Sequence, residues 1–345
     1  MSQASLPQRF DSVEVLEEFM SSPSPELVSD LKTLSGDILV LGVGGKMGPS
    51  LARLAKRAAP LGKRVIGVAR FSEPGVRDSL GRAGVEAISL DLLDRGGLER
   101  LPKAPNVVFM AGRKFGAAGN VPLTWAMNVQ VPAMVAEVFK ASRIVVFSTG
   151  CVYPFVPVDS GGATEDVPPV PPPGDYANSC VGRERMFEYF SALHGTPGRL
   201  FRLNYAIDMR YGVLHDICRK VRDDEPIDLA MGHVNVIWQG DANTVALRCL
   251  AHATKPTTPI NVTGPETIEV RRLAGEFGKL LGRKPKFTGT PAPTGWLNNA
   301  GRMVKEFGPP SVPLAKMVEW TADWLSRDMA TLNKPTHYEV RDGRY

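Results

Sequence analysis

Tyr176 and Cys180 stand four residues apart in the segment DYANSCVGRER, and both residue types can take part in chemistry. Residues at this spacing share one face of a helix. Hydride transfer to or from an alcohol carbon needs a group that exchanges a proton with the oxygen. A tyrosine can do so if its pKa, near 10 when free, is lowered by a positive charge. Cys180 cannot supply that charge, whereas Arg183 lies seven residues beyond Tyr176 on the same face.

A glycine-rich segment, GVGGKMG, follows an apolar run and leads directly into a helical pattern. Glycines permit a tight turn and bring the backbone close to a diphosphate, which then lies at the positive N-terminus of the helix. Gly42, Gly45 and Gly48 give the spacing G-x-x-G-x-x-G, because Met47 stands where G-x-G-x-x-G requires glycine. The segment, including Lys46, is predicted to bind a dinucleotide cofactor. A purely structural strand-to-helix turn is the alternative.

The end of the next apolar run, VIGVAR, predicts which dinucleotide binds. An NAD site carries an acidic residue there, which binds the adenosine ribose. Here that place holds Ala69, and it is followed by Arg70, whose guanidinium can pair with a 2′-phosphate. We therefore expect NADP, with NAD as the alternative.

The elements that must position these residues form an α/β pattern. From 37 to 148, short apolar runs alternate with helical segments, among them one long helix through WAMNVQVPAMVAEVFKA. This alternation is typical of βαβ units and predicts a Rossmann-like, doubly wound parallel sheet. We expect an N-terminal helical extension (1–35), a dinucleotide-binding domain (36–205) and a smaller C-terminal α/β substrate domain (206–345) interleaved with it.

These motifs, with others in the same order from about 37 to 327, resemble the extended short-chain dehydrogenase/reductase superfamily, in particular its NAD-dependent epimerase/dehydratase branch. YANSC is similar to the family's Y-x-x-x-K, with Cys180 in place of the lysine. VVFSTGCVYP is similar to S-S-x-x-V-Y-G, which places Thr149 on the catalytic serine or threonine. The other matches are positions that contact the cofactor or support its site: Asp91 and Leu92 in SLDLLD, Ala111 and Gly112 in MAGRKFG, and Asn128 in WAMNVQVP.

The resemblance implies hydride transfer at a sugar, nucleotide sugar or related polyol, with Thr149 and Tyr176 as the acid–base pair. In the family, the lysine favours the phenolate and holds the nicotinamide ribose. Here Lys114 or Arg183 would replace part of that role. Cys180 is either a participant, with its thiol pKa lowered by Arg183, or a residue that only fills space.

Two other functions stay open. One is a catalytically impaired NADP-binding sensor or scaffold, and the other is an NADPH-dependent carbonyl reductase that acts on a smaller molecule. Retention of both Thr149 and Tyr176 favours an enzyme over a sensor.

Substrate contacts are expected from Lys114 after the fourth strand, from Asn204 at a later strand end, and from His233 and Trp238 in MGHVNVIWQGDAN. The C-terminal segment KPTHYEVRDGRY is polar and is expected to be disordered, although His337 could fold over the cleft.

Composition argues against other classes of protein. The net charge of +5, from 41 Lys and Arg against 36 Asp and Glu, is spread along the chain without the basic-aromatic stripe of a nucleic-acid site. No apolar run approaches the roughly 18 residues that span a bilayer, and the N-terminus lacks a secretory pattern. The four cysteines form no C-x-x-C pair and no cluster with the histidines, so neither a metal site nor a disulfide is indicated. We expect a cytoplasmic homodimer with a small-molecule partner.

Overall fold

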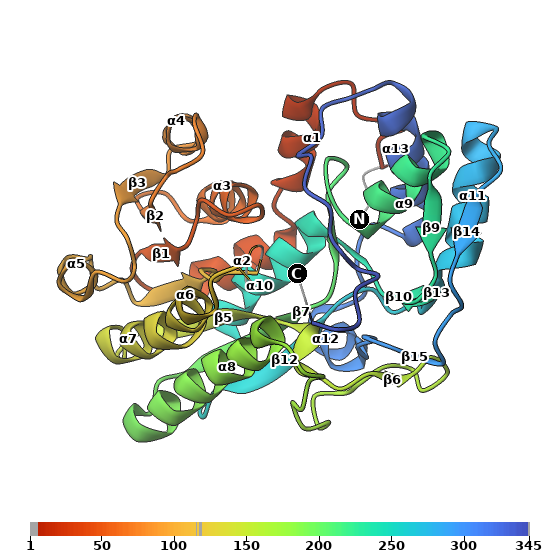
Figure 1. Ribbon diagram of the computed structural model, residues 1–345. Coiled ribbons are helices and arrows are strands. Elements are labelled where there is room, and N and C mark those ends of the chain that lie inside the picture. The colour runs from red at the N-terminus through yellow and green to blue at the C-terminus, as the bar shows by residue number, and fades with distance from the viewer. Residues whose placement is uncertain (1–5, 115, 117–118, 344–345) are drawn as a thin grey trace.

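The central sheet of the computed structural model, which describes residues 6–114, 116 and 119–343, has seven parallel strands in the order β12-β7-β5-β4-β1-β2-β3 (Figure 1). The strands are β1 (Ile38–Leu41), β2 (Val65–Ala69), β3 (Glu86–Ser89), β4 (Asn106–Phe109), β5 (Arg143–Thr149), β7 (Gly198–Leu203) and β12 (Thr258–Val262). The strand order reverses beside β1, which opens a crevice outside the carboxyl ends of β1 and β4. This confirms the predicted doubly wound α/β sheet.

Helices cover both faces of this sheet (Figure 1). One layer contains α2 (Pro25–Thr33), α3 (Gly48–Ala58) and α10 (Gln239–Ala251), and the other contains α5 (Arg95–Arg100), α7 (Val131–Val138) and α8 (Asp175–His194), while α4 (Val76–Arg82) lies at the β3 edge. The apolar side chains of each layer pack on one face of the sheet, as Leu51 and Leu250 do on the first and Val135 and Phe187 on the second. Burial on both faces explains why the strands are almost continuously apolar.

A second, smaller unit follows the sheet strand β7. Its helices are α9 (Val213–Arg222), α11 (Val270–Leu281), α12 (Gly301–Phe307) and α13 (Leu314–Ser326). Its short strands, together with β6 (Val156–Pro157), are β8 (Ala206–Ile207), β9 (Pro226–Asp228), β10 (His233–Val234), β11 (Ile237–Trp238), β13 (Ile268–Glu269), β14 (Lys286–Thr288) and β15 (Thr294–Gly295). The chain returns to the central sheet through β12, so the later part of the sequence is interleaved with the earlier part. The exact domain limits remain a prediction.

The N-terminal helices α1 (Val13–Met20) and α2 begin where serines can cap them. The side chains of Ser12 and Ser24 accept hydrogen bonds from the backbone N–H groups of Val15 and Leu27. The apolar faces of both helices are buried in the main cores.

The long helix predicted through WAMNVQVPAMVAEVFKA is interrupted in the structure. It consists of α6 (Val121–Trp125), a π-helical turn η1 (Ala126–Gln130) and α7. Such π-turns occur frequently at functional sites. Here the turn carries Asn128, which is fully buried. Within the described residues, no helix is long and apolar enough to cross a membrane.

Candidate active site

A cavity of about 710 Å³ lies outside the carboxyl ends of the central strands and extends to the substrate side of the molecule. It joins a smaller pocket of about 230 Å³ at the ends of β2 and β3, and the two share several residues of the glycine segment. The larger volume is typical of small-molecule sites.

The glycine segment forms a cradle that side chains would fill. Gly42 has a φ of +90°, and a Cβ there would lie 2.5 Å from the backbone nitrogen of Ala111. A Cβ on Gly48 would lie 2.1 Å from the carbonyl oxygen of Val43. The N-terminus of α3 carries no side-chain cap, although the N–H of Gly48 donates to the carbonyl oxygen of Gly45 at 3.2 Å and Pro49 has no N–H. The space that a Cβ would fill and the positive end of the helix fit the diphosphate of a dinucleotide.

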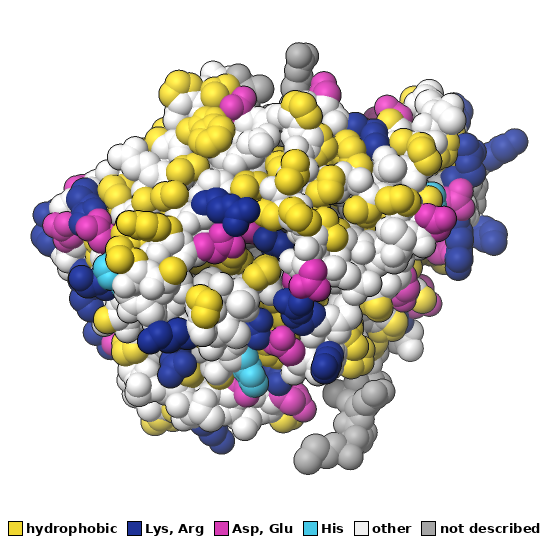
Figure 2. All heavy atoms as spheres, turned by 90° about the horizontal axis from the view of Figure 1, so that it is seen from below, with side chains coloured by type: hydrophobic (Ala, Val, Ile, Leu, Met, Phe, Trp, Pro, Cys, Tyr) yellow, Lys and Arg dark blue, Asp and Glu magenta, His cyan; other side chains and the backbone are white. Residues whose placement is uncertain are grey.

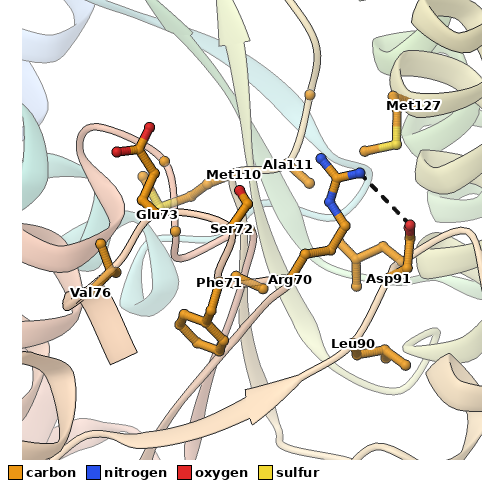
Figure 3. A pocket seen from close by; sticks show the side chains of 16 residues that line it. Arg70, Phe71, Ser72, Glu73, Val76, Leu90, Asp91, Met110, Ala111 and Met127 are labelled. Carbon is orange, nitrogen blue, oxygen red and sulfur yellow. Dashed lines mark ion pairs between the residues drawn. The ribbon is translucent and has the colours of Figure 1, made fainter. Parts of the chain in front are cut away.

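The adjoining pocket brings Arg70 and Asp91 together. Figure 3 shows the guanidinium directed toward the carboxylate, at 3.8 Å between Nη1 and Oδ2, with Glu73 on the other side of the pocket. Both side chains are largely exposed, at 64% and 43%. Such a weak, solvated pair leaves the arginine able to turn toward a ligand.

The two predicted catalytic hydroxyls meet at the wall of the larger cavity. Thr149 and Tyr176 both line it, and the Thr149 side chain is hydrogen-bonded to the tyrosine. Burial raises the pKa of Tyr176 well above its usual value of 10, whereas Arg183 and the threonine oppose that rise. At neutral pH the tyrosine therefore carries its proton.

Cys180 does not have the activated thiol that sequence reasoning considered. Its side chain is fully buried, and burial raises the pKa of the thiol to about 11, although Arg183 acts in the opposite direction. Of the two alternatives for Cys180, the raised pKa disfavours a thiol activated by Arg183 and favours a residue that fills space, because the loss of water outweighs the nearby positive charge. The thiol lies within hydrogen-bonding contact of Tyr176 and is neutral.

The guanidinium of Arg183 is a buried cation near Tyr176 and Cys180, where the family would carry a lysine. Nη1 donates to the carbonyl oxygen of Phe147 at 2.7 Å, and Nη2 donates to Oδ1 of Asn128 at 2.8 Å. A Cβ on Gly112 would lie only 2.3 Å from Nη2, so the glycine makes room for the guanidinium. Its positive charge opposes the larger rise that burial causes in the pKa of Tyr176.

Asn128 connects the loop after β4 to α8. Its Oδ1 also accepts a hydrogen bond from the backbone nitrogen of Arg113 at 2.8 Å. Its Nδ2 donates to the Arg113 carbonyl at 3.0 Å and to the hydroxyl of Ser179 at 2.9 Å. All of these partners belong to segments that border the cavity, so Asn128 fixes their mutual positions.

Lys114 is the second cation near Tyr176. Its Nζ lies 5.8 Å from the centroid of the tyrosine ring and donates to the carbonyl oxygen of Thr336 at 3.3 Å. Burial lowers the pKa of this ammonium group. Lys114 thus lines the cavity, at the place predicted for a substrate contact.

A buried ion pair holds the strands and the helix that carry the catalytic pair. Arg202 in β7 binds Glu184 in α8 at 2.7 Å, with both side chains at most 2% exposed. The hydroxyl of Ser148 in β5 donates to the same carboxylate at 2.5 Å. Sequence reasoning did not identify this pair. Arg202 in the largely apolar strand β7 was a signal for a buried charge, whereas Glu184 lies among other charged residues of α8.

The structure does not bring two of the four predicted substrate residues to the cavity. Trp238 is 2% exposed and packs with Phe10, Phe19 and Trp320 between the N-terminal segment and α13. His233 lies in β10, opposite Glu269. Both residues lie within the short strands β10 and β11 of the second unit and not in the lining of the cavity. Of the remaining two, Asn204 lines the cavity as Lys114 does.

The C-terminal segment is ordered over the cleft, contrary to the expected disorder. Asn333, Lys334, Pro335 and Thr336 line the larger cavity. Two tyrosines also line it: Tyr205, which the sequence placed beside Asn204 as a residue that either meets substrate or only packs, and Tyr211, which sequence reasoning missed. A polar tail and isolated tyrosines carry no pattern that predicts such a placement.

The chain is similar to known proteins in sequence and in fold. Residues 38–208, about half of the chain, match the sequence model of the NAD dependent epimerase/dehydratase family. No curated protein matches the sequence.

Three solved structures illustrate the similarity in fold. The UDP-glucose 4-epimerase of Thermotoga maritima, in complex with UDP-glucose, has a TM-score of 0.72 at 16% identity, over 85% of this chain and 99% of that chain. The dTDP-glucose 4,6-dehydratase DesIV of Streptomyces venezuelae, with NAD bound, has a TM-score of 0.71 at 20% identity, and the match covers 85% of this chain and 97% of that chain. The epimerase Mth375 of Methanothermobacter thermautotrophicus has a TM-score of 0.70 at 16% identity, and the match covers 89% of this chain and 97% of that chain. At these identities the likeness is one of fold.

Proposed function

Because the chain belongs to the NAD dependent epimerase/dehydratase family through residues 38–208, we propose that it is an oxidoreductase of the extended short-chain dehydrogenase type. It would transfer hydride to or from a carbon of a sugar, nucleotide sugar or related polyol. The observation that carries this proposal is the meeting of Thr149 and Tyr176 in a cavity that is also lined by the glycine cradle. The solved enzymes of similar fold support it, because several are sugar-nucleotide enzymes by name.

A nicotinamide dinucleotide bound in the cradle would supply or accept the hydride. Residues of the chain would transfer the proton. Tyr176 holds its proton at neutral pH and would donate it to a carbonyl oxygen of the substrate as hydride reaches the carbon. Thr149 would donate a hydrogen bond to the same oxygen, and Arg183 would stabilise the phenolate that remains.

We propose NADP as the preferred cofactor, with NAD as the alternative. Arg70 supports this choice because its guanidinium lies at the end of β2 with one weakly paired carboxylate, Asp91, as its acidic partner at 3.8 Å. A 2′-phosphate placed here would give the guanidinium a stronger, bidentate partner.

A sensor without turnover is the second candidate. The observation that favours it is the raised pKa of Tyr176 beside the neutral Cys180, since an unassisted tyrosine transfers its proton poorly.

Cofactor absorbance separates the two candidates. Change in the nicotinamide absorbance on mixing the purified chain, cofactor and a panel of sugars, sugar phosphates and polyols supports the enzyme, and its absence throughout the panel contradicts it.

We also propose that the chain forms a homodimer. Exposed apolar side chains on α8, Tyr189 at 59% and Leu193 at 58%, support an interface on that helix. The face on the lower side of the molecule carries hydrophobic side chains scattered among charged ones (Figure 2). Light scattering of the intact chain and of the Tyr189→Ser, Leu193→Ser variant tests this: the variant should be a monomer.

A further inference from the structure

The C-terminal segment 333–336 lines the larger cavity and is attached on both sides of it. Nζ of Lys334 forms an ion pair with Glu73, in the loop after β2, at 2.8 Å. The backbone nitrogen and hydroxyl of Thr336 donate to Oδ2 of Asp216, in α9, at 2.7 and 2.6 Å. Glu73 belongs to the sheet unit and Asp216 to the second unit, so the segment joins the two units across the cavity.

The two pockets of the site meet at the glycine cradle. Gly44, Gly45 and Glu73 are among the residues that line both pockets. The smaller pocket contains Arg70, the proposed partner of the adenosine end of the cofactor, and the larger one contains Tyr176. A dinucleotide that reaches from Arg70 to Tyr176 therefore has its diphosphate at this junction.

Lys334 supplies positive charge at the junction, where the carboxylate of Glu73 alone would repel a diphosphate. The ammonium group of Lys334 lowers the pKa of the Glu73 carboxyl through its hydrogen bond and its charge. Its charge also acts on Lys46, which belongs to the cradle: burial, Lys114 and Lys334 together lower the pKa of Lys46 to about 7. The ammonium group of Lys334 thus lies near both the loop after β2 and the cradle.

The ion pair between Lys334 and Glu73 is able to rearrange. The two side chains are 49% and 60% exposed, and solvated pairs of this kind are weak. A lysine ammonium on its flexible stem can turn toward a second anion nearby. A diphosphate offers it more negative charge than one solvated carboxylate does.

We propose that the C-terminal segment completes the dinucleotide site and that Lys334 binds the diphosphate of the cofactor held by the glycine cradle. The bound dinucleotide then holds the segment in place, and the segment in turn strengthens dinucleotide binding. This inference rests on the cofactor class of the proposed function, but it does not depend on turnover.

Calorimetric titration of the full chain with NADP, NAD and adenosine 2′-monophosphate tests the contact. Lys334→Ala should weaken the binding of NADP and NAD alike, by about tenfold, because both contain the diphosphate. Adenosine 2′-monophosphate, which has no diphosphate, should keep its affinity, and Lys334→Arg should largely retain the binding of both dinucleotides. Unchanged affinity for NADP and NAD in Lys334→Ala would overturn the proposal. So would a loss for NADP alone, because it would place the lysine at the 2′-phosphate.

Two further variants separate a direct contact from other effects. Lys286→Ala removes a similarly exposed lysine that pairs with Asp224 outside the cavity, and it should leave dinucleotide binding unchanged. Lys334→Ala combined with Glu73→Gln also removes the carboxylate that Lys334 offsets. If Lys334 binds the diphosphate, this double variant should still bind dinucleotides weakly. Full recovery of affinity would show that the lysine only neutralises Glu73, which contradicts the proposal.

Hydrogen exchange measures the coupling between the segment and the cofactor. NADP should slow the exchange of the backbone from 331 to 338 in the unaltered chain, and it should do so less in Lys334→Ala. Exchange across this range that NADP does not change would contradict the coupling.

The outcomes also distinguish this inference from the proposed function. Weaker binding of both dinucleotides in Lys334→Ala, without a redox change of the cofactor by any panel compound, would support the role of the segment and count against the enzyme. Turnover by the unaltered chain, together with unchanged dinucleotide affinity in Lys334→Ala, would support the enzyme and count against the role of the segment.

Discussion

Arg183 and Asn128 are joined by a hydrogen bond of 2.8 Å from Nη2 to Oδ1, which holds a buried cation near Tyr176, the proposed acid. The arginine comes from α8, one turn beyond Cys180, and its charge partly offsets the rise that burial causes in the pKa of Tyr176. The chain thus lacks the lysine of its family but places a different cation near the same tyrosine.

Replacing this cation should slow proton transfer. Arg183→Met is expected to reduce kcat about tenfold or more and to move the basic limb of the pH–rate profile upward, because the phenolate loses a positive charge that opposes the rise in its pKa. Steady-state kinetics across pH measure this. The control is Arg185→Met, an exposed residue of the same helix that pairs with Glu188. An unchanged pH profile in the Arg183 variant would show that the arginine is only structural.

Restoring the family lysine should conflict with Arg183. Cys180→Lys would place a second cation in a fully buried position next to the guanidinium, so the variant should unfold at a lower temperature. Adding Arg183→Ala should recover stability, with a coupling energy of about 1 kcal/mol or more. Thermal melts of the single and double variants give this value. If the changes in stability caused by the two substitutions simply add, the charges at positions 180 and 183 do not interact.

The choice of cofactor should depend on Arg70. Arg70→Ala is expected to weaken NADP binding about tenfold and to leave NAD binding nearly unchanged, because the 2′-phosphate is present in NADP alone. Fluorescence titration with both dinucleotides measures the ratio, and NAD serves as the internal control. Equal losses for the two cofactors would contradict selection of the phosphate by this residue.

The lowered pKa of Lys46 should make stability depend on pH. Its ammonium group loses a proton near pH 7 in the folded chain but near 10.5 in the unfolded chain, so between these values the unfolded chain binds more protons. This contribution therefore increases the free energy of unfolding as pH rises from 7. Urea unfolding at pH 6.5 and 8.5 should show a smaller increase, or a larger decrease, in Lys46→Met than in the unaltered chain. Identical pH dependence would mean that Lys46 keeps its proton.

The C-terminal segment should open when its two attachments are removed. Lys334→Ala combined with Thr336→Val removes the ion pair with Glu73 and the hydroxyl contact with Asp216. Hydrogen exchange of the backbone from 331 to 338 should then become faster, with the rest of the chain unchanged. Thr331→Val, outside these attachments, is the control. Unaltered exchange in the double variant would show that Tyr338 and the later contacts hold the segment alone.

The sequence predicted the sheet and the cradle because their signals are local. The strand–glycine–helix pattern around Gly42 and the alternation of apolar runs each depend on neighbouring residues only. The position of Thr149 followed from its similarity to a known motif. For these features, short-range pattern and structure agree.

Other features depend on long-range packing and were not predictable in the same way. Trp238 was expected to contact substrate, but it lies in β11 and its ring packs against Phe10 and Trp320, both distant in sequence. The tail looked polar enough for disorder, yet Asp216 binds Thr336 from 120 residues away. Sequence reasoning left two candidates, Lys114 and Arg183, for the cation near Tyr176. In the structure both lie near this tyrosine.

The central claim is that Tyr176 exchanges the proton during hydride transfer. Its most direct test is rapid mixing of the NADPH-bound chain with the carbonyl form of whichever panel compound is turned over, followed at the nicotinamide absorbance. Tyr176→Phe should bind cofactor normally and oxidise it about 100-fold more slowly or worse, as expected for the loss of a general acid. Oxidation at an unchanged rate in this variant would contradict the account.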